Sequence, residues 1–103
     1  MTRPSRLERD VVNRWLELHP LWILENGHLI GDVHTKDYPG AVALLQAQVP
    51  LAQGLDHHPT ATVSYRELRL DLWTHDREGL TQLDLDYAEG FETLLEGYAN
   101  LLS

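Results

Sequence analysis

One short stretch near position 70 restricts the possible folds of this chain more than any other feature. In it, leucines alternate with other residues: Leu68, Leu70 and Leu72 with Arg69, Asp71 and Trp73. Successive side chains of a strand point to opposite faces, so this period of two predicts a strand with one buried face. The strand therefore requires an antiparallel sheet that is covered on one side only.

Two hairpins are predicted to supply the strands of that sheet. Within residues 21–35, Asn26-Gly27 separates two apolar runs. This dipeptide is the strongest short hairpin signal, because both of its residues readily take positive φ. Residues 60–75 form the second predicted hairpin, and its turn is expected near Arg66-Glu67.

Apolar residues at helical spacing predict three helices. The first covers about residues 5–19, with Thr2 or Ser5 as a candidate cap, and ends at Pro20 because the residue before a proline avoids the α region. The apolar stripe of this helix consists of Leu7, Val11, Trp15 and Leu18.

The other two helices have recognisable start signals. Thr35 is the expected N-cap of a helix over residues 36–53, in which Pro50 should cause a bend or a stop near Val49. Thr81 begins the last helix, and Asp84 follows at the spacing of a capping box. The apolar stripe of the middle helix is Tyr38, Ala41, Val42, Leu45, Val49 and Ala52.

The predicted order of elements is thus α-β-β-α-β-β-α. Segregated hairpins and helices indicate an α+β fold, a four-stranded antiparallel sheet with helices packed on one face. The 103 residues suit a single domain, 1–103, with one modest core.

Composition excludes several classes of function. The formal net charge is -8, from 16 acidic and 8 basic residues, and without a basic stripe direct nucleic-acid binding is not expected. The absence of cysteine excludes disulfides, thiolate metal sites and thiol nucleophiles. No apolar run approaches the ~20 residues of a membrane span, and the start does not resemble a signal peptide, so a cytoplasmic protein is expected.

Three of the six histidines lie in one short region, as His57-His58-Pro59 and His75. Imidazole titrates near neutral pH, so such a cluster suits proton transfer, metal binding or a pH switch. Adjacent side chains in an extended segment point apart, so one metal ion cannot easily use both His57 and His58, and no metal site is expected. The same reasoning predicts that one of the two rings lies deeper than the other.

Acid–base chemistry and a plain surface loop remain as alternatives. In the first, Trp73 offers a flat wall for a ring ligand, and Asp56, Asp76 and Asp84 orient the imidazoles. In the second, Asp56 and Asp76 are turn residues and Asp84 is a helix-start carboxylate. His19, His28 and His34 are scattered and are assigned to the second class.

The motifs of this region together resemble the pterin-4a-carbinolamine dehydratase family. They are His57-His58-Pro59, Tyr65, Thr74-His75, Gly79-Leu80-Thr81 and Asp84. The resemblance is strong over residues 55–91 and weaker over 22–52. It implies the same sheet-and-helix fold and the dehydration of 4a-hydroxytetrahydropterin to quinonoid dihydropterin, a step of tetrahydrobiopterin recycling.

The resemblance also implies roles for individual residues. His57, His58 and His75 would be the catalytic or substrate-contacting histidines, with Asp84 a supporting carboxylate near His75. Asp56, Trp73, Thr74 and Asp76 would border the pterin, which is the substrate, so no separate cofactor is implied. The reaction delivers one proton to the leaving 4a-hydroxyl and removes one from N5, and imidazoles can do both at pH 7.

The sequence departs from the family pattern at the rim of the expected pocket. Gln53 stands where the family usually has an ionisable residue, and a glutamine can only form hydrogen bonds. Thr60-Ala61 stands where an aromatic is frequent, and the usual aromatics of the second strand are replaced around Gly31 and Val33. The alternative function is therefore an inactive dehydratase-like protein that binds a protein partner, as relatives do with transcription factors or in Rubisco assembly.

Self-association is also expected. An antiparallel sheet with open edges tends to pair or to be protected, and the family forms dimers and tetramers. The last helix carries a long apolar stripe, which includes Leu94, Leu95, Tyr98, Leu101 and Leu102. We therefore expect a homodimer or a homotetramer.

Overall fold

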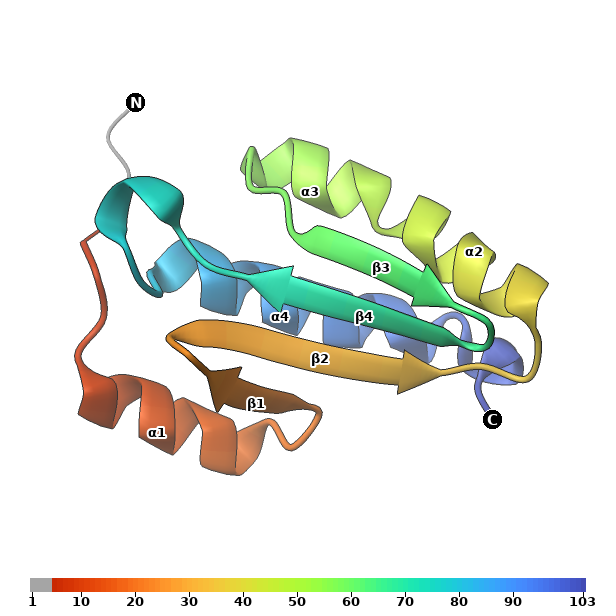
Figure 1. Ribbon diagram of the computed structural model, residues 1–103, viewed down its shortest axis with the longest axis horizontal. Helices are drawn as coiled ribbons and strands as arrows, with labels where there is room; N and C mark the ends of the chain where they lie inside the picture. Colours follow the sequence, from red (N-terminus) through yellow and green to blue (C-terminus); the bar gives the residue numbers. More distant parts are fainter. Residues whose placement is uncertain (1–4) are drawn as a thin grey trace.

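A four-stranded antiparallel sheet with helices on one face makes up the fold, as the computed structural model of residues 5–103 shows (Figure 1). The elements are α1 (Arg9–Leu18), β1 (Trp22–Glu25), β2 (His28–His34), α2 (Tyr38–Ala47), α3 (Val49–Leu55), β3 (Thr60–Ser64), β4 (Glu67–Leu72), η1 (His75–Arg77), α4 (Gln82–Glu96) and η2 (Ala99–Leu101). The predicted α+β class and the order α-β-β-α-β-β-α are confirmed.

The sheet has the strand order β1-β2-β4-β3, so β2 and β4 form its centre. Register pairs Leu29 with Leu72 and Asp32 with Arg69. Leu68, Leu70 and Leu72 of β4 are fully buried, as the alternation predicts. On the opposite face Arg69 donates to Asp32 of the neighbouring strand β2 and to Glu25 of β1, one strand farther away. Polar side chains therefore cover the side of the sheet that faces away from the helices.

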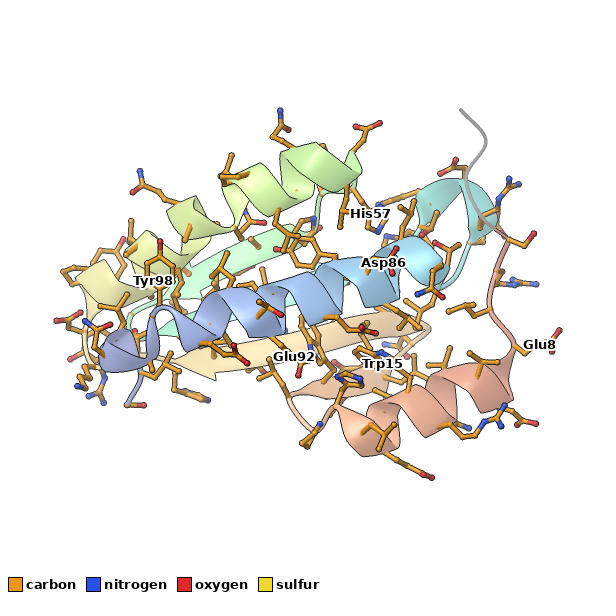
Figure 2. The ribbon with its side chains drawn as sticks, turned by 180° about the vertical axis from the view of Figure 1, so that it is seen from behind. Glu8, Trp15, His57, Asp86, Glu92 and Tyr98 are labelled. Atoms are coloured by element: carbon orange, nitrogen blue, oxygen red, sulfur yellow. The ribbon has the colours of Figure 1, made fainter. Side chains whose placement is uncertain are left out.

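The helices form one layer, in which α4 runs along the sheet between α1 and the pair α2 and α3 (Figure 2). Tyr87 and Phe91 of α4 are fully buried and stack with ring centroids 6.3 Å apart. Trp22 of β1 meets Phe91 edge-on, at 6.2 Å. The core thus lies between the leucine face of β4 and the inner side of α4.

Both hairpin turns contain residues with positive φ, the backbone conformation that tight hairpin turns require. Asn26 and Gly27 have φ of 53° and 78°, which confirms the predicted first turn. The second turn lies at Tyr65-Arg66, one residue earlier than predicted, and Tyr65 takes a φ of 51°. The earlier turn lets Ser64 pair with Glu67 at the end of the ladder.

The first helix differs from its prediction at its start. It begins at Arg9 rather than near residue 5, because the Leu7 N–H donates to the Leu80 carbonyl, 2.8 Å away, and holds the preceding chain against the loop after η1. The predicted cap Thr2 lies outside the described residues. Val12 is buried, whereas the predicted stripe members Val11 and Leu18 are 38% and 80% exposed.

The predicted middle helix is two helices, which meet at Gln48. Pro50 takes an early position of α3, where its missing N–H removes no helical hydrogen bond. The cap of α2 is Asp37, which accepts from the Gly40 N–H at 2.8 Å, and not Thr35. Thr35 instead donates its hydroxyl to backbone carbonyls and pairs with Leu102 near the C-terminus.

No helix within residues 5–103 combines the length and the apolar composition that crossing a membrane would take.

Gly31 at the centre of the sheet leads to a prediction about stability. An added Cβ would lie 2.7 Å from Cζ3 of Trp22, a buried ring that cannot swing away. Gly31→Ala should therefore lower the free energy of unfolding by about 1–3 kcal/mol, measured by urea denaturation.

Gly54→Ala is the matched control, because a Cβ there meets no atom within 4 Å and the residue lies in α3. It should leave stability unchanged or raise it by up to about 1 kcal/mol. Equal stability of Gly31→Ala and the wild type would contradict the packing described for Trp22.

Candidate active site

A cleft of about 180 Å³ opens at one end of the sheet, where two chain segments meet. One segment is the turn between α3 and β3, and the other follows β4. The lining residues are Asp56, His57, His58, Trp73, Thr74, His75 and Asp76. These are all the residues assigned to the site from the sequence, apart from Asp84, which lies fully buried beneath.

Backbone geometry brings the first segment into place. Asp56 ends α3 in the left-handed region, with φ of 49°, and reverses the chain. The His57 N–H then donates to the Ala52 carbonyl at 3.0 Å, so the turn is closed by a backbone hydrogen bond. His57 is 6% exposed and His58 is exposed, which confirms that one of the two adjacent rings lies deeper.

The second segment is closed by a pair of backbone contacts. The Thr74 N–H donates to the Gly79 carbonyl at 2.9 Å, and the chain between them forms the short helix η1. Glu78 completes the turn with a φ of 53°. This closed loop presents His75 and Asp76, both exposed, toward the cleft.

Asp84 joins these segments to the start of α4. Its Oδ1 lies 2.6 Å from Nε2 of His57, and its Oδ2 accepts from the Thr74 hydroxyl and the Thr81 N–H, both at 2.8 Å. Figure 2 shows His57 beside the first turns of α4. The capping box predicted for Thr81 and Asp84 is confirmed. The Asp84 carboxylate therefore caps α4 and also orients His57 in the cleft.

The direction of these hydrogen bonds determines which ring nitrogen of His57 carries the proton. A carboxylate only accepts, so Nε2 of His57 carries the proton and Nδ1 is the nitrogen left for chemistry. The Thr74 hydroxyl donates to Asp84, so it accepts from the Thr81 hydroxyl, 2.8 Å away. The family resemblance implied that Asp84 supports His75, and the hydrogen bond between Asp84 and a histidine that the structure shows is the one with His57.

His58 has a different partner, the Gln53 side chain of α3. Its Nε2 lies 2.6 Å from Oε1 of Gln53, which accepts the hydrogen bond. The amide fixes the tautomer of His58 as the carboxylate does for His57, but it brings no negative charge. Gln53 therefore has the plain hydrogen-bonding role expected from its replacement of an ionisable residue.

An aromatic row borders the other side of the cleft. The ring of Trp73 lies 4.4 Å from that of His75, and 4.5 Å from that of His28, with which it is nearly parallel at 17°. The sequence assigned His28 to surface structure, yet it lies beside the site. The pairing of Leu29 with Leu72 puts His28 opposite Trp73, and this register between distant hairpins could not be read from local patterns.

The remaining histidines lie away from the cleft. His19 binds Glu92 of α4 through Nδ1 at 2.8 Å and stacks on Trp15, with centroids 4.0 Å apart. His34 lies at the far end of β2, near Glu67. Among residues 5–103, no group of three or more histidine, aspartate or glutamate side chains is arranged to hold a metal ion.

The cleft thus brings three imidazoles together in three settings. His57 is buried against a carboxylate, His58 is exposed beside an amide, and His75 is exposed against an indole ring. The carboxylate and the amide accept from Nε2 of His57 and His58, which leaves Nδ1 of each ring for contact with a ligand. Such a set can hold a proton at one ring while another ring remains a neutral acceptor.

Comparison with known proteins identifies the family of this chain. A family model described as "Pterin 4 alpha carbinolamine dehydratase" matches residues 5–94. A protein of Saccharolobus solfataricus is 39% identical over 85 residues, 82% of this chain and 81% of that protein. One of Chloroflexus aurantiacus is 31% identical over 90 residues, 87% and 97% of the two chains. Both carry the name "Putative pterin-4-alpha-carbinolamine dehydratase".

A solved structure supports the same assignment. The chain resembles a "transcriptional coactivator/pterin dehydratase" from Brucella melitensis with a TM-score of 0.80 and 25% identity, over 87% of this chain and 98% of that one. The family match covers most of the sequence, including both segments that form the cleft. This chain is therefore a member of the pterin-4a-carbinolamine dehydratase family.

Proposed function

We propose that this protein dehydrates 4a-hydroxytetrahydropterin to quinonoid dihydropterin by histidine general acid–base catalysis. One observation carries the proposal: His57, His58 and His75 line a single cleft above the buried Asp84, in a member of this family. In addition to capping α4, the buried Asp84 carboxylate contacts the buried ring of His57, so a carboxylate and an imidazole are paired at the base of the cleft.

The reaction needs two proton movements and no redox change. One proton goes to the 4a-hydroxyl, which leaves as water when its C–O bond breaks. One proton leaves N5, and its electron pair forms the new double bond to C4a. An acid and a base must therefore face the same ring, and neighbouring imidazoles suit both roles near pH 7.

His57 is the ring that the cleft orients most firmly. Its Nε2–H donates to the buried Asp84 carboxylate, so Nδ1 is the nitrogen available to the substrate. When Nδ1 carries a proton, it can donate that proton to the leaving hydroxyl. His57 is therefore proposed as the general acid and Asp84 as the residue that positions it.

His58 and His75 are proposed to act as neutral rings. Gln53 gives His58 a hydrogen-bond acceptor without charge, so Nδ1 of His58 retains a lone pair. His75 is exposed against Trp73 and can exchange protons with water. Both rings are proposed to be needed for removal of the N5 proton, and the exposed position of both allows the proton to pass to solvent.

Of the remaining lining residues, Asp56, Asp76 and Trp73 are proposed to bind the pterin. Asp56 and Asp76 can accept from ring N–H groups, and Trp73 gives an apolar border. The Thr74 side chain is already committed to Asp84, so this residue would act by holding the carboxylate. The cleft of about 180 Å³ is smaller than the ~300–1,000 Å³ of drug-sized sites. It suits part of a bicyclic ring, with the substituent left in solvent.

An assay of freshly generated 4a-hydroxytetrahydropterin tests the proposal directly. The wild type should accelerate dehydration over the spontaneous rate. Removal of an acid or base typically costs ~10²–10⁴-fold, so His75→Ala and His58→Ala should each lose a large part of the acceleration. Both rings are exposed, so stability should change by no more than about 0.5 kcal/mol.

His34→Ala is the control for this assay, because it removes an exposed histidine at the far end of β2. It should keep the wild-type rate. A wild-type rate equal to the spontaneous one, from folded protein, would refute the enzymatic proposal.

Gln53 provides a second, more specific prediction. Gln53→Glu would place a carboxylate beside His58 and favour its imidazolium form. If neutral His58 accepts the proton, the rising limb of kcat/KM should move to higher pH, because more alkaline solution is then needed to deprotonate it. The measurement is the pH profile of dehydration.

Gln46→Glu is the charge-matched control, since Gln46 is exposed on α2 and does not line the cleft. It should leave the profile unchanged. An identical shift in both variants would indicate a general effect of net charge and would count against His58 as the base.

A protein-binding function without catalysis is the second candidate. The replacement of an ionisable residue by Gln53 favours it. So does the likeness to the Brucella melitensis protein, which is described as a transcriptional coactivator as well as a pterin dehydratase. Folded protein with no acceleration in the assay would support this candidate over the first.

Self-association is proposed because the sheet has open edges and apolar surface is exposed beyond α4. Strands β1 and β3 are the edges of the sheet, and Tyr98 beyond α4 is 37% exposed. Burial of an edge and of this apolar end in a homodimer or homotetramer would remove both from water. Sedimentation equilibrium at micromolar concentration should give a mass of two or four chains. A monomer mass would contradict the proposal.

A further inference from the structure

His28 stands at the beginning of β2, just behind the aromatic border of the cleft. Its ring is stacked on Trp73, with centroids 4.5 Å apart and planes 17° from parallel. Its Nδ1 lies 2.6 Å from Oδ1 of Asp71, which comes two residues before Trp73 on β4. The His28 ring is thus fixed at its edge by a carboxylate while its flat side covers the indole.

Two of the three imidazoles that line the cleft each have a hydrogen-bonding partner that orients them. His57 has Asp84, and His58 has Gln53. His75 follows β4 in the η1 turn, and its ring contact is with Trp73, at 4.4 Å and a tilt of 55°. The orientation of His75 therefore depends on where the Trp73 ring lies.

We infer that His28 is a positioning residue for His75, acting through Trp73. Asp71 holds His28, the His28 ring fixes one side of Trp73, and Trp73 fixes the imidazole that takes part in proton transfer. The catalytic consequence rests on the function proposed above. The geometric part of the inference, that the ring of His28 determines the orientation of the His75 ring, does not depend on that function.

Two features distinguish this role from simple packing. His28 does not line the cleft, so it cannot act by contact with the substrate. The side chains of His28 and Asp71 are also 28% and 34% exposed, so neither belongs to the buried core. Cross-strand neighbours of this kind contribute modestly to stability, and their removal leaves the sheet in place.

The kinetic test compares His28→Gln with His34→Gln. Glutamine can still reach Asp71 but provides no ring for Trp73, and His34 is the matched histidine at the other end of β2, also beside a carboxylate. His28→Gln should lower kcat about 10-fold with little change in KM, because small errors in placing a catalytic group cost rate rather than binding. His34→Gln should match the wild type.

A double-mutant cycle with His75→Ala makes the test specific. If His28 acts through His75, His28→Gln should have no further effect on kcat once His75 is absent. An equal loss in both backgrounds would overturn the inference, since it would show a general or independent effect. Asp71→Ala should reproduce the loss seen with His28→Gln.

A spectroscopic readout separates this inference from the proposed function. The ring current of Trp73 displaces the NMR resonances of the His75 ring protons, so these should move in His28→Gln and stay unchanged in His34→Gln. If the wild type shows no dehydration, the proposed function fails and the NMR comparison still decides the positioning. Unchanged His75 resonances in His28→Gln would overturn it whatever the activity.

Discussion

The hydrogen bonds of one buried carboxylate connect the parts of this fold that are otherwise far apart in the sequence. Asp84 is fully buried. Its oxygens accept from the Thr81 N–H just before α4, from the Thr74 hydroxyl after β4, and from the His57 ring after α3. A buried charge is tolerated only where such partners satisfy it. The start of α4, the segment after β4 and the turn after α3 therefore converge at Asp84, and their hydrogen bonds offset the cost of burying its charge.

This convergence makes the candidate site part of the architecture rather than an addition to its surface. His57 is both a hydrogen-bond donor that the buried carboxylate needs and a lining residue of the cleft. His58 and His75 have no such structural duty, because both are exposed and contact an amide or an indole ring. The fold thus gives three chemically identical side chains different contacts and different exposure, and an acid–base pair requires rings that play different roles.

Local patterns in the sequence predicted those parts of the structure that depend on neighbouring residues. The alternation of Leu68 to Leu72 and the Asn26-Gly27 turn specified strands and their faces, and Thr81 with Asp84 specified the start of α4. The histidine bound by Asp84 and the position of His28 depend instead on how distant segments pair. Such a register is set by packing across the whole sheet, which no short pattern contains.

Pro50, which interrupts the predicted middle helix, shows how a local departure can serve the site. The break at Gln48 is held by the Tyr87 hydroxyl, which donates to Oε1 of Gln48 at 2.5 Å. Burial raises the pKa of the Tyr87 phenol, so the hydroxyl keeps its proton at neutral pH and remains a donor.

Beyond the break, α3 starts afresh with Pro50 in a position that needs no N–H, and Leu51 packs where Gly90 leaves room on α4. Because α3 packs against α4, the turn that follows it places His57 at the beginning of α4, where Nε2 of His57 lies 2.6 Å from Oδ1 of Asp84.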